Sequence, residues 1–279
     1  MRSTVVTFPE GQVSGRSEIV GSVPVGVRHG LVTAVTPFHP LDHTWPDQPA
    51  DLGTIGGLSV VDCVTGAMSA DGEVFLGEDI PVRRGTDDWE WLVVHVAEEP
   101  IEVGTEVELV VDAGYRRSLS AGHTACHLAA LALNAALAGH WRKETRLDAL
   151  GHPDFDQSAI TSSRITPNGS LDDYRLGKSL RKKGFSAEGL DLDEVAGQAN
   201  DTLKTWVGAD APVWIDVPGP GLTARRTWHC ALPEGEVFIP CGGTHLERTS
   251  QLGSVTVALT LSEDGSALAM HTTVDPRWA

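Results

Sequence analysis

The chain has 279 residues, 41% of them hydrophobic, which is enough apolar material to bury one sizeable core or two smaller ones. No apolar run reaches signal-peptide length or the roughly 20 residues that span a bilayer, so we expect a globular protein without a membrane partner. The four cysteines are too scattered for a disulfide framework, and we therefore expect a cytoplasmic location. The net charge of −17 argues at first sight against nucleic-acid partners, and we expect no DNA binding, because Lys and Arg supply phosphate contacts.

The charges are unevenly distributed along the chain. Residues 1–110 carry 18 acidic and 5 basic side chains, whereas residues 111–279 carry 20 acidic and 16 basic ones. A basic cluster in the second part consists of Arg175, Lys178, Arg181, Lys182 and Lys183, with Arg164 upstream. Such a cluster either meets a phosphate backbone or forms a solvated helix end, and the sequence leaves both interpretations open.

The predicted elements change character near residue 110. Short Val-rich segments separated by Gly, Pro and Asp predict strands at 26–35, 53–64, 89–96 and 106–111, and hence a small β-barrel or sandwich. An Ala- and Leu-rich run from Ser118 to Gly139 then predicts a buried helix capped by Ser118 or Ser120. Further predictions are a loop-like stretch at 151–171, a helix at 192–206, and strands at 213–217, 227–231, 237–239, 254–262 and 268–274.

Two short segments carry the most specific pattern of the chain. They read His123-Thr-Ala-Cys-His127 and Cys241-Gly-Gly-Thr-His245. Residues four apart on a helix lie on one face, so His123 and His127 can bind one metal ion from the same side. The second segment adds a thiolate and a third imidazole, a donor set that Zn²⁺ accepts in tetrahedral geometry. The alternative is a buried Cys241 with unrelated histidines.

The donor set also bears on what the metal does. Structural zinc sites usually carry two or more thiolates, whereas His-rich sites favour catalysis. The residue after His123 is Thr124, where zincin metalloproteases have their Glu general base, so a peptidase of that kind is not expected. Gln48, Thr124 and Thr244 are candidate catalytic residues that could orient substrate or water by hydrogen bonding, or could simply cap local backbone.

Both metal segments resemble those of the alanyl-tRNA synthetase editing-domain family, which includes the free-standing AlaX-type trans-editing proteins and is related to a domain of threonyl-tRNA synthetase. The resemblance extends to Asp112 with Arg116 and Arg117 before the helix. Phe38-His39-Pro40 and the run Gln48-Pro-Ala-Asp-Leu-Gly-Thr-Ile55 are similar to two further family segments. The chain departs from the family at Trp45-Pro46-Asp47, where relatives have glycines before the Gln.

The resemblance implies an α+β fold, with a β-barrel-like domain at 1–110 and a zinc-binding editing domain at 111–279 whose metal-binding helix packs on an antiparallel sheet. It also implies Zn²⁺-dependent hydrolysis, in trans, of the ester that joins Ser or Gly to tRNA(Ala), so mischarged tRNA is the expected partner. The oligomeric state stays open. The expected substrate-binding residues are Arg116, Arg117, Gly242 and Gly243. The two arginines could instead pair with Asp112.

Two alternatives remain at the level of the sequence. The acidic residues 1–110 and the changed loop at 45–47 favour a hydrolase of the same fold that acts on a small ester or amide without tRNA. The other alternative is a binding module in which zinc is structural. Because zinc can either polarise a carbonyl and acidify water or merely order a site, the sequence does not choose between these roles.

Overall fold

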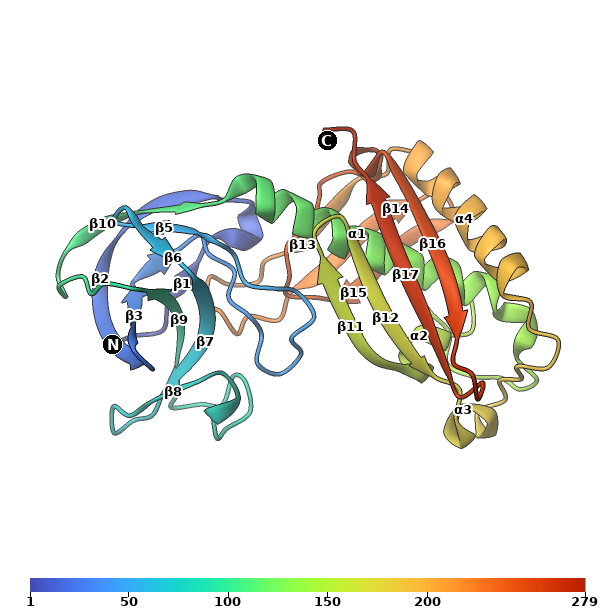
Figure 1. Ribbon diagram of the computed structural model, residues 1–279, viewed down its shortest axis with the longest axis horizontal. Helices are drawn as coiled ribbons and strands as arrows, with labels where there is room; N and C mark the ends of the chain where they lie inside the picture. The colour runs from blue at the N-terminus through green and yellow to red at the C-terminus, as the bar shows by residue number, and fades with distance from the viewer. Residues whose placement is uncertain (279) are drawn as a thin grey trace. The chain divides into compact units, whose positions relative to one another are not determined.

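The computed structural model describes residues 1–278 and shows a mixed α+β structure of two compact units (Figure 1). Unit 1 consists of Met1–Arg117, Ile215–Thr227 and Pro240–Thr244, and unit 2 contains the rest of the described chain. Each unit therefore combines segments that are far apart in the sequence. Within the described residues, no helix has both the length and the apolar character needed to cross a membrane.

Unit 1 is built on an antiparallel eight-stranded sheet in the order β6-β5-β10-β2-β3-β9-β7-β8, which curls into a half-barrel (Figure 1). A short parallel pair, β1-β4, accompanies it. The strands are β1 (Val5–Val6), β2 (Ser14–Val25), β3 (Arg28–Thr33), β4 (Val35–Thr36), β5 (Gly53–Ile55), β6 (Leu58–Val60), β7 (Asp62–Met68), β8 (Val74–Leu76), β9 (Glu90–Ala97) and β10 (Glu106–Val111). Two 3-10 turns, η1 (Phe8–Glu10) and η2 (Gly77–Asp79), complete the elements. Alternate residues of the strands, among them Ile19, Leu31, Ile55 and Leu109, form the buried core.

Helix α1 (Ala113–Ala136) begins five residues earlier than the sequence pattern predicts. Asp112 Oδ1 accepts a hydrogen bond from Tyr115 N at 2.9 Å, so this carboxylate, and neither Ser118 nor Ser120, caps the first turn. The two histidines consequently lie in the middle of the helix and not near its start. Gly122 allows close packing, because a Cβ there would stand 2.4 Å from the Gly169 carbonyl oxygen.

Unit 2 contains a four-stranded sheet, β11-β12-β17-β16, and a three-stranded sheet, β13-β14-β15. Their bounds are β11 (Ile160–Thr166), β12 (Gly169–Arg175), β13 (Val213–Asp216), β14 (Thr227–Leu232), β15 (Gly235–Pro240), β16 (Ser254–Leu261) and β17 (Ala267–Asp275). The helices and 3-10 turns are η3 (Ala138–His140), α2 (Phe155–Ala159), α3 (Lys178–Lys182), α4 (Leu192–Gly208) and η4 (Thr249–Leu252). The loop predicted at 151–171 is wrong, since α2, β11 and the start of β12 occupy it.

Helix α4 matches its prediction and covers the edge of the four-stranded sheet. Asp191 caps the helix by accepting from the amides of Asp193 and Glu194. In the helix, Asn200 forms two hydrogen bonds with the backbone of Val257 in the edge strand β16, at 3.1 and 2.7 Å. These bonds satisfy backbone groups that an uncovered edge strand would leave exposed.

Candidate metal centre

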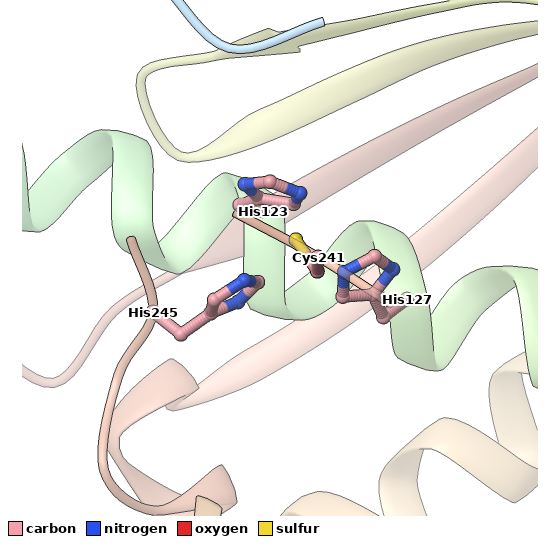
Figure 2. Close-up of side chains that lie close together, drawn as sticks. All are labelled: His123, His127, Cys241 and His245. Atoms are coloured by element: carbon pink, nitrogen blue, oxygen red, sulfur yellow. The ribbon is translucent and has the colours of Figure 1, made fainter. Parts of the chain in front are cut away.

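Three histidines and one cysteine come together as the two motifs predict (Figure 2). Helix α1 presents His123 and His127 from successive turns, and the loop after β15 supplies Cys241 and His245. One ligand atom from each residue lies within 4.8 Å of the others. Ligand atoms of a tetrahedral zinc site stand roughly 3.3–3.7 Å apart, given bonds of about 2.0–2.3 Å. The cluster is therefore only slightly wider than a metal-bound site.

The imidazoles of His123 and His127 are in the protonation state that binds a metal. Burial lowers the pKa of His123 to about 3, and burial together with the neighbouring His123 lowers the pKa of His127 well below its ordinary value. Both rings are therefore neutral at pH 7, as metal ligation requires. In the described structure, His127 Nε2 is buried and has no hydrogen-bond partner. A coordinated cation would satisfy this nitrogen.

The thiol also fits a metal ligand. Burial raises the pKa of Cys241 to about 12, the carboxylate of Asp47 contributes to the rise, and a hydrogen bond from the Gly243 backbone opposes it. A coordinating cation would deprotonate the thiol. The Gly243 amide, which the sequence assigned to substrate binding, therefore supports the sulfur of Cys241. Gly242 has open space where a Cβ would stand.

Trp228 and Thr124 surround the histidines within unit 2. The indole of Trp228 is fully buried and its ring centroid lies 4.9 Å from that of His127 and 5.8 Å from that of His245. Thr124 Oγ1 accepts from Leu246 N at 3.1 Å and lies 3.3 Å from His245 Nδ1. The hydroxyl of Thr124 thus contacts the loop that carries His245 at two points, the His245 ring and the Leu246 backbone.

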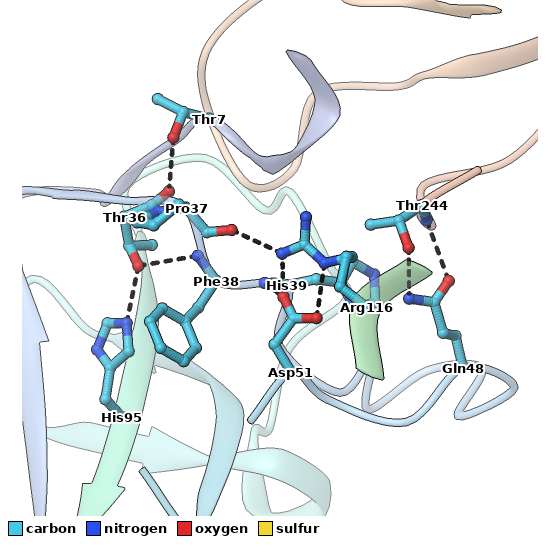
Figure 3. Close-up of polar contacts among 10 residues, drawn as sticks. All are labelled: Thr7, Thr36, Pro37, Phe38, His39, Gln48, Asp51, His95, Arg116 and Thr244. Atoms are coloured by element: carbon cyan, nitrogen blue, oxygen red, sulfur yellow. Dashed lines mark hydrogen bonds and ion pairs between the residues drawn. The ribbon is translucent and has the colours of Figure 1, made fainter. Parts of the chain in front are cut away.

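Gln48 and Thr244 form a reciprocal pair within unit 1 (Figure 3). Gln48 Nε2 donates to Thr244 Oγ1, and Thr244 N donates to Gln48 Oε1, both at 3.0 Å. The pair ties the loop before β5 to the residue that precedes His245. In the same loop, Asp47 Oδ1 accepts from Gln48 N at 2.7 Å, and burial raises the pKa of Asp47 to about 6.

The two arginines before the metal motif have different environments. Arg116 is buried and donates to both carboxylate oxygens of Asp51 and, at 2.8 Å, to the carbonyl of Pro37 (Figure 3). Asp51 also accepts from His39 N at 2.5 Å. Arg116 therefore joins α1 to the loop at 37–51, and its partner is not Asp112. Arg117 is exposed.

Sequence reasoning missed Trp228 as part of this region, and it included Asp51 in the run at 48–55 without foreseeing the ion pair with Arg116. Alternation in β14 was the available signal, because buried Trp228 and Cys230 flank the half-buried His229. For Asp51, no local pattern distinguishes a buried ion pair from an exposed loop carboxylate. Cys126 faces away from the metal ligands, since its thiol donates to Asp172 Oδ1 at 3.4 Å.

The chain has distant relatives among known proteins. No model of a known protein family matches the chain. The chain is 26% identical to the alanyl-tRNA editing protein AlaX-M of Pyrococcus horikoshii over 223 residues, which cover 79% of this chain and 75% of the relative.

The chain is also similar to alanine–tRNA ligases. It is 29% identical to the ligase of Bradyrhizobium diazoefficiens over 69% of this chain, and 24% identical to that of Desulfosudis oleivorans over 86%. The matched regions span 22% and 24% of the two ligases. The chain is therefore a distant homologue of the alanyl-tRNA editing protein AlaX-M and of alanine–tRNA ligases.

Proposed function

We propose that this protein is a Zn²⁺-dependent deacylase that hydrolyses the aminoacyl ester of Ser-tRNA(Ala) or Gly-tRNA(Ala) in trans. The observation that carries the proposal is the cluster of three histidines and one cysteine, in a chain homologous to an alanyl-tRNA editing protein. His123, His127, Cys241 and His245 would hold the ion. When bound, zinc would supply Lewis acidity toward a carbonyl oxygen and lower the pKa of water.

The residues around the cluster fix the ligands in place. Thr124 orients His245, while the Gln48–Thr244 pair positions the loop that carries Cys241. The buried indole of Trp228 excludes water from one side of the imidazoles. Exclusion of water strengthens electrostatic interactions within the site, because the local dielectric constant is lower than that of water.

The roles assigned from the sequence become more specific in this proposal. Thr124, Gln48 and Thr244 act as positioning residues. Both the NH2 group and the carbonyl oxygen of the Gln48 side chain form hydrogen bonds with Thr244, and the hydroxyl of Thr124 contacts the loop that carries His245. In this proposal the exposed Arg117 and Gly242, which has open space beside its Cα, would contact the tRNA terminus. Arg116 supports the site through Asp51 and does not face substrate.

The deciding experiment compares deacylation of Ser-tRNA(Ala), Gly-tRNA(Ala) and Ala-tRNA(Ala) by the zinc-loaded protein. We expect release of Ser or Gly with a kcat/KM at least about tenfold above that for Ala. This ratio corresponds to about 1.4 kcal/mol, which one hydrogen bond to the Ser hydroxyl or steric exclusion of the Ala methyl can supply. A His127→Ala variant that is folded by circular dichroism serves as the control and should be inactive. Absence of cleavage of either mischarged tRNA, with zinc bound, contradicts the proposal.

A second candidate is hydrolysis of a small ester or amide without tRNA. It is favoured by the 18 acidic against 5 basic side chains of residues 1–110 and by Trp45-Pro46-Asp47 in the loop beside Gln48. Cleavage of an aminoacyl methyl ester in the absence of any activity on mischarged tRNA would favour this candidate over tRNA editing.

A further inference from the structure

In the folded chain, a second basic segment joins the part of the sequence cluster that lies on α3 and the turn after it. Arg142 N donates to Gly184 O at 2.8 Å, Ser186 N donates to His140 O at 2.9 Å, and Lys143 Nζ reaches Lys182 O at 3.3 Å. Residues 140–143 therefore lie beside α3 and the turn after it. The combined surface, called here the basic platform, consists of Arg142, Lys143, Lys178, Arg181, Lys182 and Lys183.

Aromatic side chains pack beneath the basic platform. The ring of Phe185 lies 5.5 Å from that of Trp141 and 5.0 Å from that of Phe155. Gly184 has φ +110°, and a Cβ there would stand 2.8 Å from the Cβ of Lys143, so the two basic segments approach as closely as glycine permits. The backbone positions that carry these basic side chains are thus fixed by packing.

The charges of the platform are not neutralised by the described part of the chain. All six side chains are exposed, and none of them lies within 4.0 Å of an acidic group among the described residues. Residues 139–143 and 177–187 contain no Asp or Glu, and Glu144 and Glu188 follow at their ends. Like charges that are held together repel one another, and a polyanion relieves this repulsion.

The platform also contrasts with the rest of the molecule. It gathers six of the 21 basic residues of a chain whose net charge is −17. An acidic protein repels RNA over most of its surface, so a concentrated basic surface determines where and in which orientation the RNA docks. Lys and Arg at this density suit phosphates, and contacts to phosphate carry no sequence information.

We propose that the basic platform binds the phosphate backbone of the tRNA whose aminoacyl ester enters the metal centre. The proposal rests on the proposed editing function for the identity of the RNA. Contacts to phosphate set position and orientation without reading sequence. The platform therefore contributes to affinity for any tRNA and leaves the choice of amino acid to the metal centre.

The test uses a platform variant, Lys143→Ala with Lys182→Ala and Lys183→Ala, and a control variant, Arg16→Ala with Arg28→Ala and Lys204→Ala. Both variants change the net charge by the same amount through exposed side chains. Binding of unacylated tRNA is measured by fluorescence anisotropy at several salt concentrations. We expect the platform variant to bind at least about tenfold more weakly, with a salt slope reduced by about 2–3, and the control to change less than about twofold.

Equal tRNA affinity of the platform variant and the wild type, equal losses in both variants, or absence of tRNA binding by the wild type overturns the proposal. A second measurement separates this result from failure of the editing function. Hydrolysis of a 3′-aminoacyl adenosine, which lacks the tRNA backbone, should be unchanged in the platform variant. If tRNA binds at the platform but no mischarged tRNA is cleaved, the editing function fails while the platform stands.

Discussion

At the scale of single residues, the clustering of four candidate metal ligands was predictable, because the members of each pair stand four positions apart in one short segment. The hydroxyl next to the first ligand was harder to interpret. For Thr124 the sequence left two roles open, orienting substrate or water and capping local backbone; in the structure its hydroxyl accepts from Leu246 N and lies 3.3 Å from His245 Nδ1. That relation depends on two segments 121 positions apart in the chain, which no local pattern specifies.

Thr124 provides the first prediction. When His245 binds metal through Nε2, its Nδ1–H donates to Thr124 Oγ1, which fixes the tautomer and the ring orientation. Thr124→Val keeps the shape and removes the acceptor, so we expect about 10–100-fold weaker zinc binding in competition with a chromophoric chelator. Thr124→Ser, the matched control, should bind almost as tightly as the wild type. Equal zinc affinity of the Val and Ser variants would contradict this role.

At the scale of elements, the two long helices, α1 and α4, and several strands follow the sequence pattern, while other elements do not. Strand β2 went unrecognised because Gly15, Gly21 and Pro24 interrupt its alternation. β11 and β12 are rich in Ser, Thr, Asp and Arg, which resembles a loop, although Ser163 and Ser170 both donate to the buried Asp172. Strands that carry buried polar networks of this kind lack the alternating hydrophobic pattern from which strands are predicted.

The second prediction concerns the ion pair that joins α1 to the loop at 37–51. The side chains of Asp51 and Arg116 are 0% and 6% exposed, so removing one partner leaves a buried charge. Asp51→Asn should lower the free energy of unfolding by about 3–5 kcal/mol, as measured by urea denaturation. The double variant Asp51→Asn with Arg116→Met should recover part of this loss. A loss below about 1 kcal/mol would show that the pair does not anchor the loop.

The third prediction concerns His95, which fastens β9 to the same region. Its Nδ1 donates to Leu31 O at 2.9 Å, so its Nε2, 2.8 Å from Thr36 Oγ1, accepts from that hydroxyl (Figure 3). Burial lowers the pKa of His95 to about 4, from an ordinary value of 6.5. Between these values the unfolded chain binds a proton that the folded chain does not, so stability falls as the pH decreases from about 6.5 to about 4.

The size of this effect follows from the shift, which corresponds to up to about 3 kcal/mol. Urea denaturation of the wild type and of His95→Asn at several pH values isolates the contribution of this ring from that of the carboxylates. We expect the stability advantage of the wild type to be largest above pH 6.5 and to shrink toward pH 4. An advantage that is constant across this range would exclude His95 as the titrating group.

At the scale of the whole molecule, the sequence indicates a β-rich first part and an α+β second part, but not how the units are composed. Ile215–Thr227 and Pro240–Thr244 belong to unit 1 although they lie far beyond residue 110. These two late segments join unit 1 through packing between residues far apart in the sequence, and short-range periodicity does not encode such packing. The basic platform has the same origin, since Arg142 and Lys143 join α3 only through the fold.

The central claim is that the metal held by the four predicted ligands makes this chain a deacylase. The most direct test titrates Zn²⁺ into chelator-treated protein while bound metal and the rate of Ser-tRNA(Ala) deacylation are measured in the same samples. We expect the metal-free protein to be inactive and the rate to rise in proportion to bound zinc, up to one ion per chain. Full activity of the metal-free protein, or one bound zinc per chain with no deacylation, would contradict the claim.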